Sequence, residues 1–455
     1  MIQLRRIKVK NFKCFSDEQD LELGRLTLLT GANSTGKSSL MYSVLGALQS
    51  PRFPFAYSAN GRFVNMGNFS EIVFGHDKDR EMEIGFSLTE KGFNIDIDTL
   101  WKNDEINDQP QLCKYEAHSP LFDLLIVPKT GDKNSEYYLT LDYRPPHSIN
   151  LPERSRELVL ANLYRIAEEY KSVHNGEDVS DKLRAGLEDR TIVKDTSLKI
   201  EGNSIYCYDD VQALVAYSQV SEIIRHRIED YKSQMNFISS YRLKGERIYL
   251  EEDLDNGKIQ ASGKGFVNQL LHWRESNREN YEALVGAMRS MGLLYDIEPK
   301  RIGGGQFRVG VSVHKESPLA SLNDVGFGIS QLLPVVVGDI ELGEGSTLFT
   351  AQPEIHLHPN AQANYADYMI SQLVHGKNYV VETHSEYLLN RIRLAIVKGA
   401  LKEEDVSIYY LSQEKDSTKV YPVQFTKSGQ IIGAPKDFFE TYMIDVMNIA
   451  MEAIG

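Results

Sequence analysis

The sequence predicts an α/β fold with a parallel sheet, interrupted by a mostly helical insertion. An apolar run at 25–30 ends in a glycine-rich loop, as a buried strand does before a phosphate site. Near the other end of the chain, short apolar runs are separated by helical stretches, which is the alternation typical of parallel sheets; they are 347–350, 378–382 and 406–411.

The middle of the chain has a different pattern. Residues 153–170 and 220–235 carry apolar side chains three and four apart among many charges, which predicts amphipathic helices too interrupted for a long coiled coil. We therefore expect an N-terminal lobe at 1–150, a helical insertion at 151–300 and a C-terminal lobe at 301–455.

The composition indicates a folded, acidic protein. The 455 residues are 42% apolar and carry a net charge of -14, which argues against a protein that coats nucleic acid. Cys14, Cys113 and Cys207 lie far apart and have no metal-ligand spacing, which suggests a reducing compartment. No signal peptide and no apolar stretch of about 18 residues is present, so we expect a cytoplasmic protein without a membrane partner.

The densest basic run lies near the N-terminus, in an alternating strand at 2–9 and the turn that follows it. It comprises Arg5, Arg6, Lys8, Lys10 and Lys13. Two interpretations stay open: a solvated strand face, which is the ordinary use of such alternation, and a contact with nucleic acid.

Residues 31–38 read Gly-Ala-Asn-Ser-Thr-Gly-Lys-Ser and fit the P-loop pattern without a departure. Glycines let the backbone amides curl around phosphate, Lys37 supplies a cation, and the Ser38 hydroxyl suits Mg²⁺. A helix at 38–49 follows and offers its N-terminus to the anion. We expect ATP and Mg²⁺ at this loop, bound by Gly31, Ala32, Asn33, Ser34, Thr35, Gly36, Lys37, Ser38 and Ser39.

A second segment, 347–354, has the form of a Walker B strand but ends in Ala351, which can neither hold a Mg²⁺ shell nor position water. Gln352 follows as the polar group that could orient water. His356 and His358 lie two apart with no further ligand set, so we do not expect a metal pair there.

Two further segments suit a nucleotide. A buried strand at 378–382 delivers His384 near its C-terminal end, where a histidine beside a P-loop could sense the γ-phosphate. Residues 322–331 combine capping residues and glycines before an apolar run, which predicts a helix N-terminus suited to an anion. Roughly 300 residues separate the P-loop from these strands, unlike the compact site of a P-loop GTPase or kinase.

These motifs together resemble the ABC/SMC-like AAA ATPases related to RecF and to the overcoming-lysogenization-defect proteins. The resemblance covers the first 75 residues and about 315–411, and it rests on motifs that match in sequence and in their order along the chain. They are IKVKNFKCF at 7–15, GANSTGKSS at 31–39, GFGISQLLP at 326–334, QPEIHLHP at 352–359 and THS at 383–385.

The resemblance implies an ATPase whose heads pair head to tail around ATP. It implies that Lys37 and Ser38 bind phosphate and Mg²⁺, and that Gln352 and His384 serve catalysis. Residues Asn323, Asp324 and Gly326 would contact the γ-phosphate of the partner copy.

One position departs from the group, which carries an acidic residue where this chain has Ala351. Losing that carboxylate should slow hydrolysis and leave phosphate binding largely intact. A deliberate Glu→Ala substitution and a naturally degenerate ATPase both explain it.

The resemblance also leaves the biological role open. Several relatives carry a C-terminal Toprim nuclease, but about 70 residues follow His384 here without its acidic pattern, so we expect no nuclease in this chain. PARIS-type and Septu-type relatives look like anti-phage sensors that hold a separately encoded effector, such as a nuclease. The alternatives are a RecF-like repair ATPase that binds DNA, and an inert scaffold.

Overall fold

The computed structural model describes residues 2–129, 136–144, 190–201, 204–206, 210–252, 258–435 and 438. The chain forms two compact units, each built from several stretches of sequence. The first unit comprises Met1–Leu21, Ser43–Gly61 and Asn65–Ser233, and the second comprises Glu22–Tyr42, Arg62–Val64 and Gln234–Gly455. Neither unit coincides with one of the three expected segments, which stay a prediction.

The first unit is built on an antiparallel sheet of nine strands among the described residues. The strands pair in the order β10-β9-β8-β7-β6-β5-β4-β1-β2, and every pair from β10 to β1 is antiparallel. Their bounds are β1 Ile2–Lys10, β2 Gln19–Glu22, β4 Met82–Glu90, β5 Phe93–Asp104, β6 Gln109–Ser119, β7 Phe122–Pro128, β8 Glu136–Tyr143, β9 Thr191–Glu201 and β10 Ser204–Tyr206.

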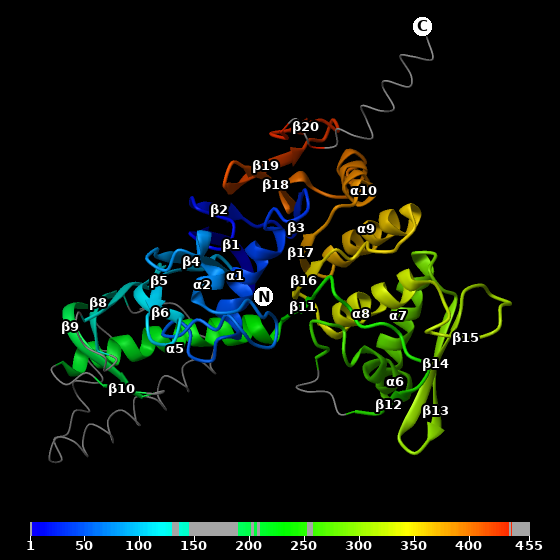
Figure 1. The fold of residues 1–455 in the computed structure, drawn as a ribbon, viewed down its shortest axis with the longest axis horizontal. Helices are drawn as coiled ribbons and strands as arrows, with labels where there is room; N and C mark the ends of the chain where they lie inside the picture. The colour runs from blue at the N-terminus through cyan, green and yellow to red at the C-terminus, as the bar shows by residue number, and fades with distance from the viewer. Residues whose placement is uncertain are drawn as a thin grey trace, which may run out of the picture. The chain divides into compact units, whose positions relative to one another are not determined.

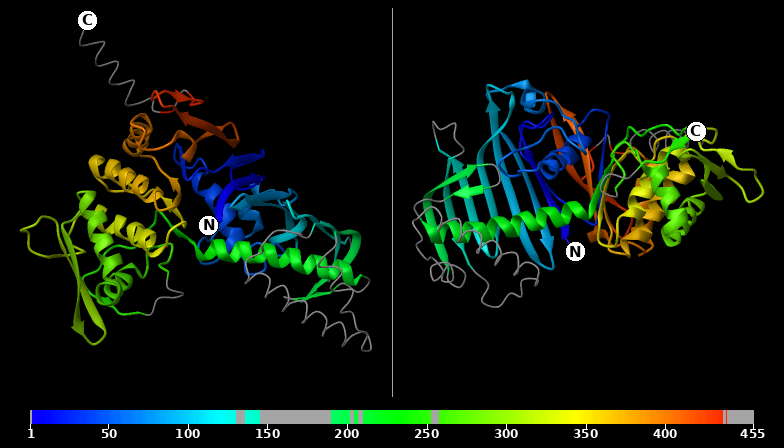
Figure 2. Two further views of the ribbon diagram at one scale, coloured as in Figure 1. Left: turned by 180° about the vertical axis from the view of Figure 1, so that it is seen from behind. Right: turned by 90° about the horizontal axis from the view of Figure 1, so that it is seen from below.

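Helix α5 (Val211–Ser233) lies along one face of this sheet (Figure 2). Residues 213–217 are all buried, and from Val220 onward the buried apolar side chains recur at helical spacing, at Val220, Ile224, Ile228 and Tyr231. An apolar stripe of this kind is stable only against another apolar surface, which the sheet provides. Two short helices, α2 (Phe69–Ile72) and η1 (Phe74–His76), belong to the same unit.

The expected helical insertion is therefore mixed in its described part. Strands β9 and β10 add to the sheet of the first unit, because strand pairing with β8 outweighs the charged composition of this stretch. The predicted helix at 220–235 is confirmed as part of α5, whereas the predicted helix at 153–170 lies outside the described residues.

The second unit contains the predicted parallel sheet, which confirms the α/β class. Strands β11, β16, β17, β3 and β18 run parallel in that order, and β19 and β20 extend the sheet antiparallel (Figure 1). Their bounds are β3 Leu26–Gly31, β11 Met235–Ile238, β16 Thr347–Ala351, β17 Asn378–Glu382, β18 Val406–Glu414, β19 Ser417–Phe425 and β20 Ile431–Ile432.

Helices and a small second sheet complete this unit. The helices are α1 Lys37–Gln49, which continues into the first unit, α6 Phe266–Ser276, α7 Arg278–Ser290, α8 Phe327–Glu341, α9 Pro359–Leu373, α10 Glu386–Val397 and η3 Glu403–Asp405. The small antiparallel sheet comprises β12 Tyr249–Leu250, β13 Asp296–Gly303, β14 Gln306–Ser312 and β15 Ala320–Ser321.

Helix α8 forms the centre of the core of the second unit. Every residue from Gly328 to Asp339 is buried, and α8 packs against α6, α7 and the parallel sheet. A helix that is apolar on all sides belongs inside a protein, and here it places its exposed N-terminus beside the segment that follows β16. None of the described helices has both the length and the apolar character that a membrane crossing requires.

Candidate functional site

The loop at 31–38 connects β3 to α1 with the backbone conformation that phosphate binding needs. Gly31 has φ 136°, Ser34 has φ 63° and Gly36 has φ 83°, so the chain turns repeatedly through the left-handed region. A side chain at Gly31 would lie 2.2 Å from the carbonyl oxygen of Leu411, so only glycine fits there. Alternating conformations of this kind turn successive N–H groups inward and form an anion-binding nest.

The side chain of Lys37 lies inside this loop. Its Nζ atom donates to the carbonyl oxygens of Gly31 at 3.2 Å and Ala32 at 2.6 Å. Burial lowers the pKa of Lys37, while Glu382 and Glu354 act in the opposite direction. Carbonyl oxygens are weak partners for a cation, so a phosphate at the rim of the loop would be a better one.

Ser38, at the first turn of α1, contacts a carboxylate that the sequence analysis did not select. Its hydroxyl donates to Oε2 of Glu382 at 2.5 Å. The amide of Gln352 donates to Oε1 of the same carboxylate at 3.5 Å. Burial raises the pKa of Glu382 above its ordinary value, and Ser38 and Lys37 oppose that change. The hydroxyl expected to meet Mg²⁺ and the polar group expected to orient water thus share one buried carboxylate.

Ala351 lies directly beside this carboxylate. It is the last residue of β16, is fully buried, and pairs in parallel register with Glu382 at the end of β17. The position that lacks an acid is therefore next to a position that has one. Gln352 follows with φ 47°, a left-handed conformation that few residues other than glycine adopt and that often marks a functional turn.

The loop after β17 is held by a second buried acid, Glu354. Its Oε1 accepts the backbone N–H of His384 at 2.7 Å. Burial raises the pKa of Glu354, and that hydrogen bond opposes the change. The His384 side chain is exposed, and partial desolvation followed by the charge of Lys37 lowers its pKa. A neutral imidazole near the loop suits the sensing role expected of His384.

A buried arginine connects the site to α8. Arg242 is 4% exposed and donates to the carbonyl oxygens of Gln331 at 3.1 Å and Gln352 at 2.6 Å. Burial lowers the pKa of Arg242 to about 10. One side chain thereby ties the helix that begins at Phe327 to the turn that carries Gln352.

The residues expected to act on a partner copy lie at the start of α8. Gly326 is exposed and forms the N-cap, while Asp324 accepts two hydrogen bonds from Arg247, at 2.7 and 2.8 Å. A side chain at Gly328 would lie 2.5 Å from the carbonyl oxygen of His356, so the helix approaches the segment after β16 closely. Asn323 donates from its backbone to Ser321 at 3.4 Å. These residues therefore make their contacts away from the P-loop of their own chain.

The two histidines after β16 have local roles. His358 caps α9 by accepting from the backbone of Asn360 at 3.4 Å. The ring of His356 meets that of Phe327 edge-on, with 4.7 Å between centroids. Cys14 and Cys113 are free thiols, and Cys207 lies outside the described residues.

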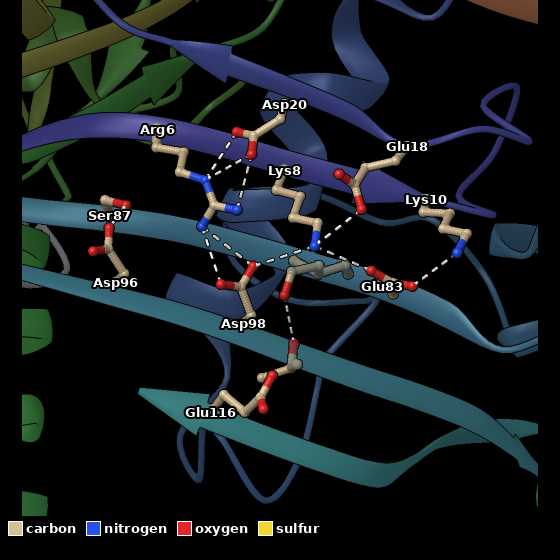
Figure 3. A network of polar contacts seen from close by, with 12 residues as sticks. Arg6, Lys8, Lys10, Glu18, Asp20, Glu83, Ser87, Asp96, Asp98 and Glu116 are labelled. Atoms are coloured by element: carbon tan, nitrogen blue, oxygen red, sulfur yellow. Dashed lines mark hydrogen bonds and ion pairs between the residues drawn. The ribbon is translucent and has the colours of Figure 1, made fainter. Parts of the chain in front are cut away.

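The basic run of the first unit is extensively paired (Figure 3). Arg6 lies between Asp20 and Asp98, at 2.8 and 3.0 Å. Lys8 meets Glu18 at 3.1 Å and Glu83 at 3.3 Å. Acidic neighbours therefore offset much of the positive charge that a nucleic-acid contact on this strand would use.

Lys10 and Lys13 are also engaged. Lys10 meets Glu83 at 3.2 Å. Lys13 donates to the backbone carbonyls of Met66 at 3.1 Å and Glu71 at 3.0 Å, so it supports a turn. These contacts favour the solvated-face interpretation of the run.

Sequence reasoning missed Glu382 and Arg242. Glu382 ends a buried parallel strand two residues before His384, a position at which α/β sheets gather ligand contacts, so that signal was present. Arg242 carried no local signal, because its two acceptors are 89 and 110 residues away.

A protein-family comparison assigns most of this chain to one family. A family model described as an AAA ATPase domain matches residues 2–389. The OLD nuclease of Thermus scotoductus is 24% identical over 440 residues; the match covers 91% of this chain but only 65% of that relative, so the chain spans less than two thirds of its length.

Solved structures of SMC heads also match. The SMC head domain of Thermotoga maritima matches with a TM-score of 0.40 at 10% identity, over 93% of this chain and 99% of that one. The Smc head of Pyrococcus yayanosii with its coiled coil and joint matches with a TM-score of 0.41 at 11% identity, over 94% and 98%.

Proposed function

Because the chain belongs to the AAA ATPase domain family, we propose that it binds ATP with Mg²⁺ at residues 31–38 and hydrolyses it slowly. The observation that carries this proposal is the convergence of the P-loop with Ser38, Glu382 and Gln352 at the carboxyl ends of neighbouring parallel strands. In α/β sheets this edge is where ligands bind.

The residues present fit a magnesium nucleotide. The backbone nest and Lys37 suit the phosphates, and Ser38 with a buried carboxylate suits a hard cation that prefers oxygen ligands. Mg²⁺ would neutralise charge that develops on the phosphates. Gln352, which Arg242 holds at its backbone, would orient water, and the exposed His384 would sense the γ-phosphate.

Slow turnover is part of the proposal because Ala351 supplies no carboxylate at the end of β16. Phosphate binding depends on the loop and on Lys37, so it should persist. Both origins of Ala351, substitution and natural degeneracy, predict the same biochemical behaviour.

We further propose that two copies pair around ATP. The N-terminus of α8 supports this, since Gly326 and Phe327 are exposed and Phe327 leaves 42% of its surface uncovered. In the pair, Asn323, Asp324 and Gly326 of one copy would meet the γ-phosphate held by the other.

For the biological role, we propose a cytoplasmic anti-phage sensor that controls a separately encoded effector. The proposal rests on analogy with relatives of the same class. Co-expression with the product of the neighbouring gene tests it: the expected result is a complex whose amount depends on ATP, and no complex with or without ATP would remove it.

A DNA-binding repair ATPase is the second candidate. The pairing of Arg6 and Lys8 with acidic neighbours weighs against it. Fluorescence anisotropy with labelled duplex DNA at low salt tests this second candidate. Phosphate contacts would give an affinity that falls steeply with added salt, and no binding at low salt would exclude it.

The ATPase proposal itself is tested by calorimetric titration with ATP and Mg²⁺. The wild-type chain should bind, and Lys37→Ala should reduce affinity by on the order of a hundredfold or more, since a charge-assisted phosphate contact is lost. Lys402→Ala, which removes an exposed lysine in the same unit, is the matched control and should bind normally. Light scattering in the same samples should show an ATP-dependent pair only where ATP binds. Failure of the wild-type chain to bind would end the proposal.

A further inference from the structure

We propose that Glu382 is the carboxylate that holds Mg²⁺ at this site, acting from β17 in the place where β16 ends in Ala351. The inference rests on the proposed binding of a magnesium nucleotide at the P-loop and adds a residue that the sequence motifs did not identify.

The strand register allows a carboxylate at position 382 to take the role of one at position 351. Ala351 and Glu382 are direct partners in the parallel pair β16–β17, so their side chains leave the sheet at the same level. On its other side β17 pairs with β3, where Glu382 is the partner of Leu29, two residues before Gly31. An acid at position 382 is thus one strand nearer to the P-loop strand than an acid at position 351 would be.

The contacts of Glu382 are those of a ligand-holding group. One oxygen accepts from Ser38 at 2.5 Å and the other from Gln352 at 3.5 Å. These are the hydroxyl that P-loops direct at Mg²⁺ and the polar side chain that follows a Walker B strand. Ser38 and Gln352 donate to the two oxygens of one carboxylate, so a cation bound to Ser38 would lie next to Glu382.

Burial gives the second argument. Glu382 is 5% exposed, and the two groups that donate hydrogen bonds to it, the Ser38 hydroxyl and the Gln352 side-chain amide, are both neutral. A buried carboxylate is costly unless a cation pairs with it or it coordinates a metal. Lys37 lies close enough to affect its pKa, yet the Lys37 ammonium donates to Gly31 and Ala32 instead. A divalent ion would add to the partial compensation that the charge of Lys37 provides.

The competing explanation is structural: Glu382 could serve only to orient Ser38 in the folded protein. The two roles differ in one measurable property. A structural acceptor affects nucleotide binding equally with and without Mg²⁺, whereas a ligand-holding carboxylate matters only when the ion is present.

The test measures the affinity for a fluorescent ATP analogue twice, in EDTA and in Mg²⁺, for the wild-type chain and for Glu382→Gln. The amide keeps an acceptor for Ser38 but loses the charge. We expect the Mg²⁺-dependent gain in affinity to fall by about tenfold or more in Glu382→Gln, with affinity in EDTA changed by less than about threefold. Glu386→Gln, four residues along the same segment, is the matched control and should keep the wild-type gain.

Each outcome is decisive. An unchanged Mg²⁺-dependent gain in Glu382→Gln would overturn the inference and leave the ATPase proposal intact. Absence of nucleotide binding by the wild-type chain in both conditions would remove both. If Glu382→Gln unfolds, Glu382→Asp replaces it: the shorter acid withdraws from Ser38, so the gain should again fall by about tenfold, and a full gain would contradict us.

Discussion

Arg242 donates a 2.6 Å hydrogen bond to the carbonyl oxygen of Gln352, although 110 residues separate them. The same guanidinium reaches the carbonyl of Gln331 in α8. A single buried cation therefore fixes the turn after β16 against the helix whose N-terminus is expected to face a partner copy. In an ATPase that pairs around nucleotide, this contact is a direct physical connection between the two halves of the composite site.

Replacing Arg242 with Met should destabilise the second unit by about 2–4 kcal/mol, because two buried carbonyls lose their donor. Trp273 lies in this unit and Trp101 in the other, so urea unfolding followed by fluorescence in a Trp101→Phe background reports on the second unit alone. Arg247→Met removes an exposed pair with Asp324 and should cost less than about 1 kcal/mol. Equal losses in both variants would contradict the bridging role of Arg242.

A buried ionic cluster around Asp339 should also contribute strongly to the stability of the second unit. Asp339, 1% exposed, meets Lys377 at 3.3 Å and accepts from Tyr368 at 2.5 Å and Tyr379 at 3.1 Å. Lys377→Met leaves this carboxylate without its cation and should cost about 3–5 kcal/mol in the same unfolding assay.

The matched control for this cluster is the double variant Asp339→Asn with Lys377→Met. It removes both charges and should recover part of the loss, as expected when a buried pair rather than one side chain is responsible. A double variant as unstable as the sum of the two single variants would argue against direct coupling.

Glu341, at the end of α8, should make stability depend on pH. Burial raises its pKa to about 7, with the Ile259 backbone and Lys258 opposing. The folded state holds this proton more tightly than the unfolded state does. The contribution of Glu341 to the free energy of unfolding is therefore fully present below about pH 4.5 and is lost as pH rises through 7. Burial lowers the pKa of Lys258 to about 8, so it stays largely protonated in this window.

Glu341→Gln should remove this loss, and its stability relative to wild type should therefore be about 1–2 kcal/mol greater at pH 7 than at pH 5. Urea midpoints across this range provide the measurement. Glu316→Gln, which changes an exposed acid of the same unit, is the matched control. If the difference in urea midpoint between wild type and Glu341→Gln does not change with pH, Glu341 is not the group responsible.

Restoring an acid at position 351 should accelerate turnover. Ala351→Glu places a carboxylate beside Glu382, and we expect kcat to rise on the order of tenfold or more while ATP affinity changes little. Steady-state phosphate release provides kcat, and the titration described above provides affinity. Ala351→Gln adds similar bulk without charge and should not accelerate turnover; if it does, the missing carboxylate is not what limits this chain.

Much of the fold and site could be predicted from the sequence alone. The α/β class, the P-loop, and the strands and helices around 25–49, 347–350, 378–382 and 406–411 are confirmed, because each depends on local periodicity and on short motifs. The assignment to P-loop AAA ATPases is confirmed by the family match.

The helical insertion was only partly predicted. Strand β9 pairs with β8 across residues that the structure does not describe, and such long-range pairing leaves no local signal in a charged stretch.

The sequence by itself determined the phosphate cradle, since a glycine-rich turn, a lysine and a hydroxyl at fixed spacing specify their own geometry. Tertiary structure alone decided which carboxylate completes it. The choice between positions 351 and 382 depends on the register of β16, β17 and β3, and β3 lies more than 300 positions before the other two strands in the chain. Strand register is set by side-chain packing across the whole sheet, so it can be read only from the folded molecule.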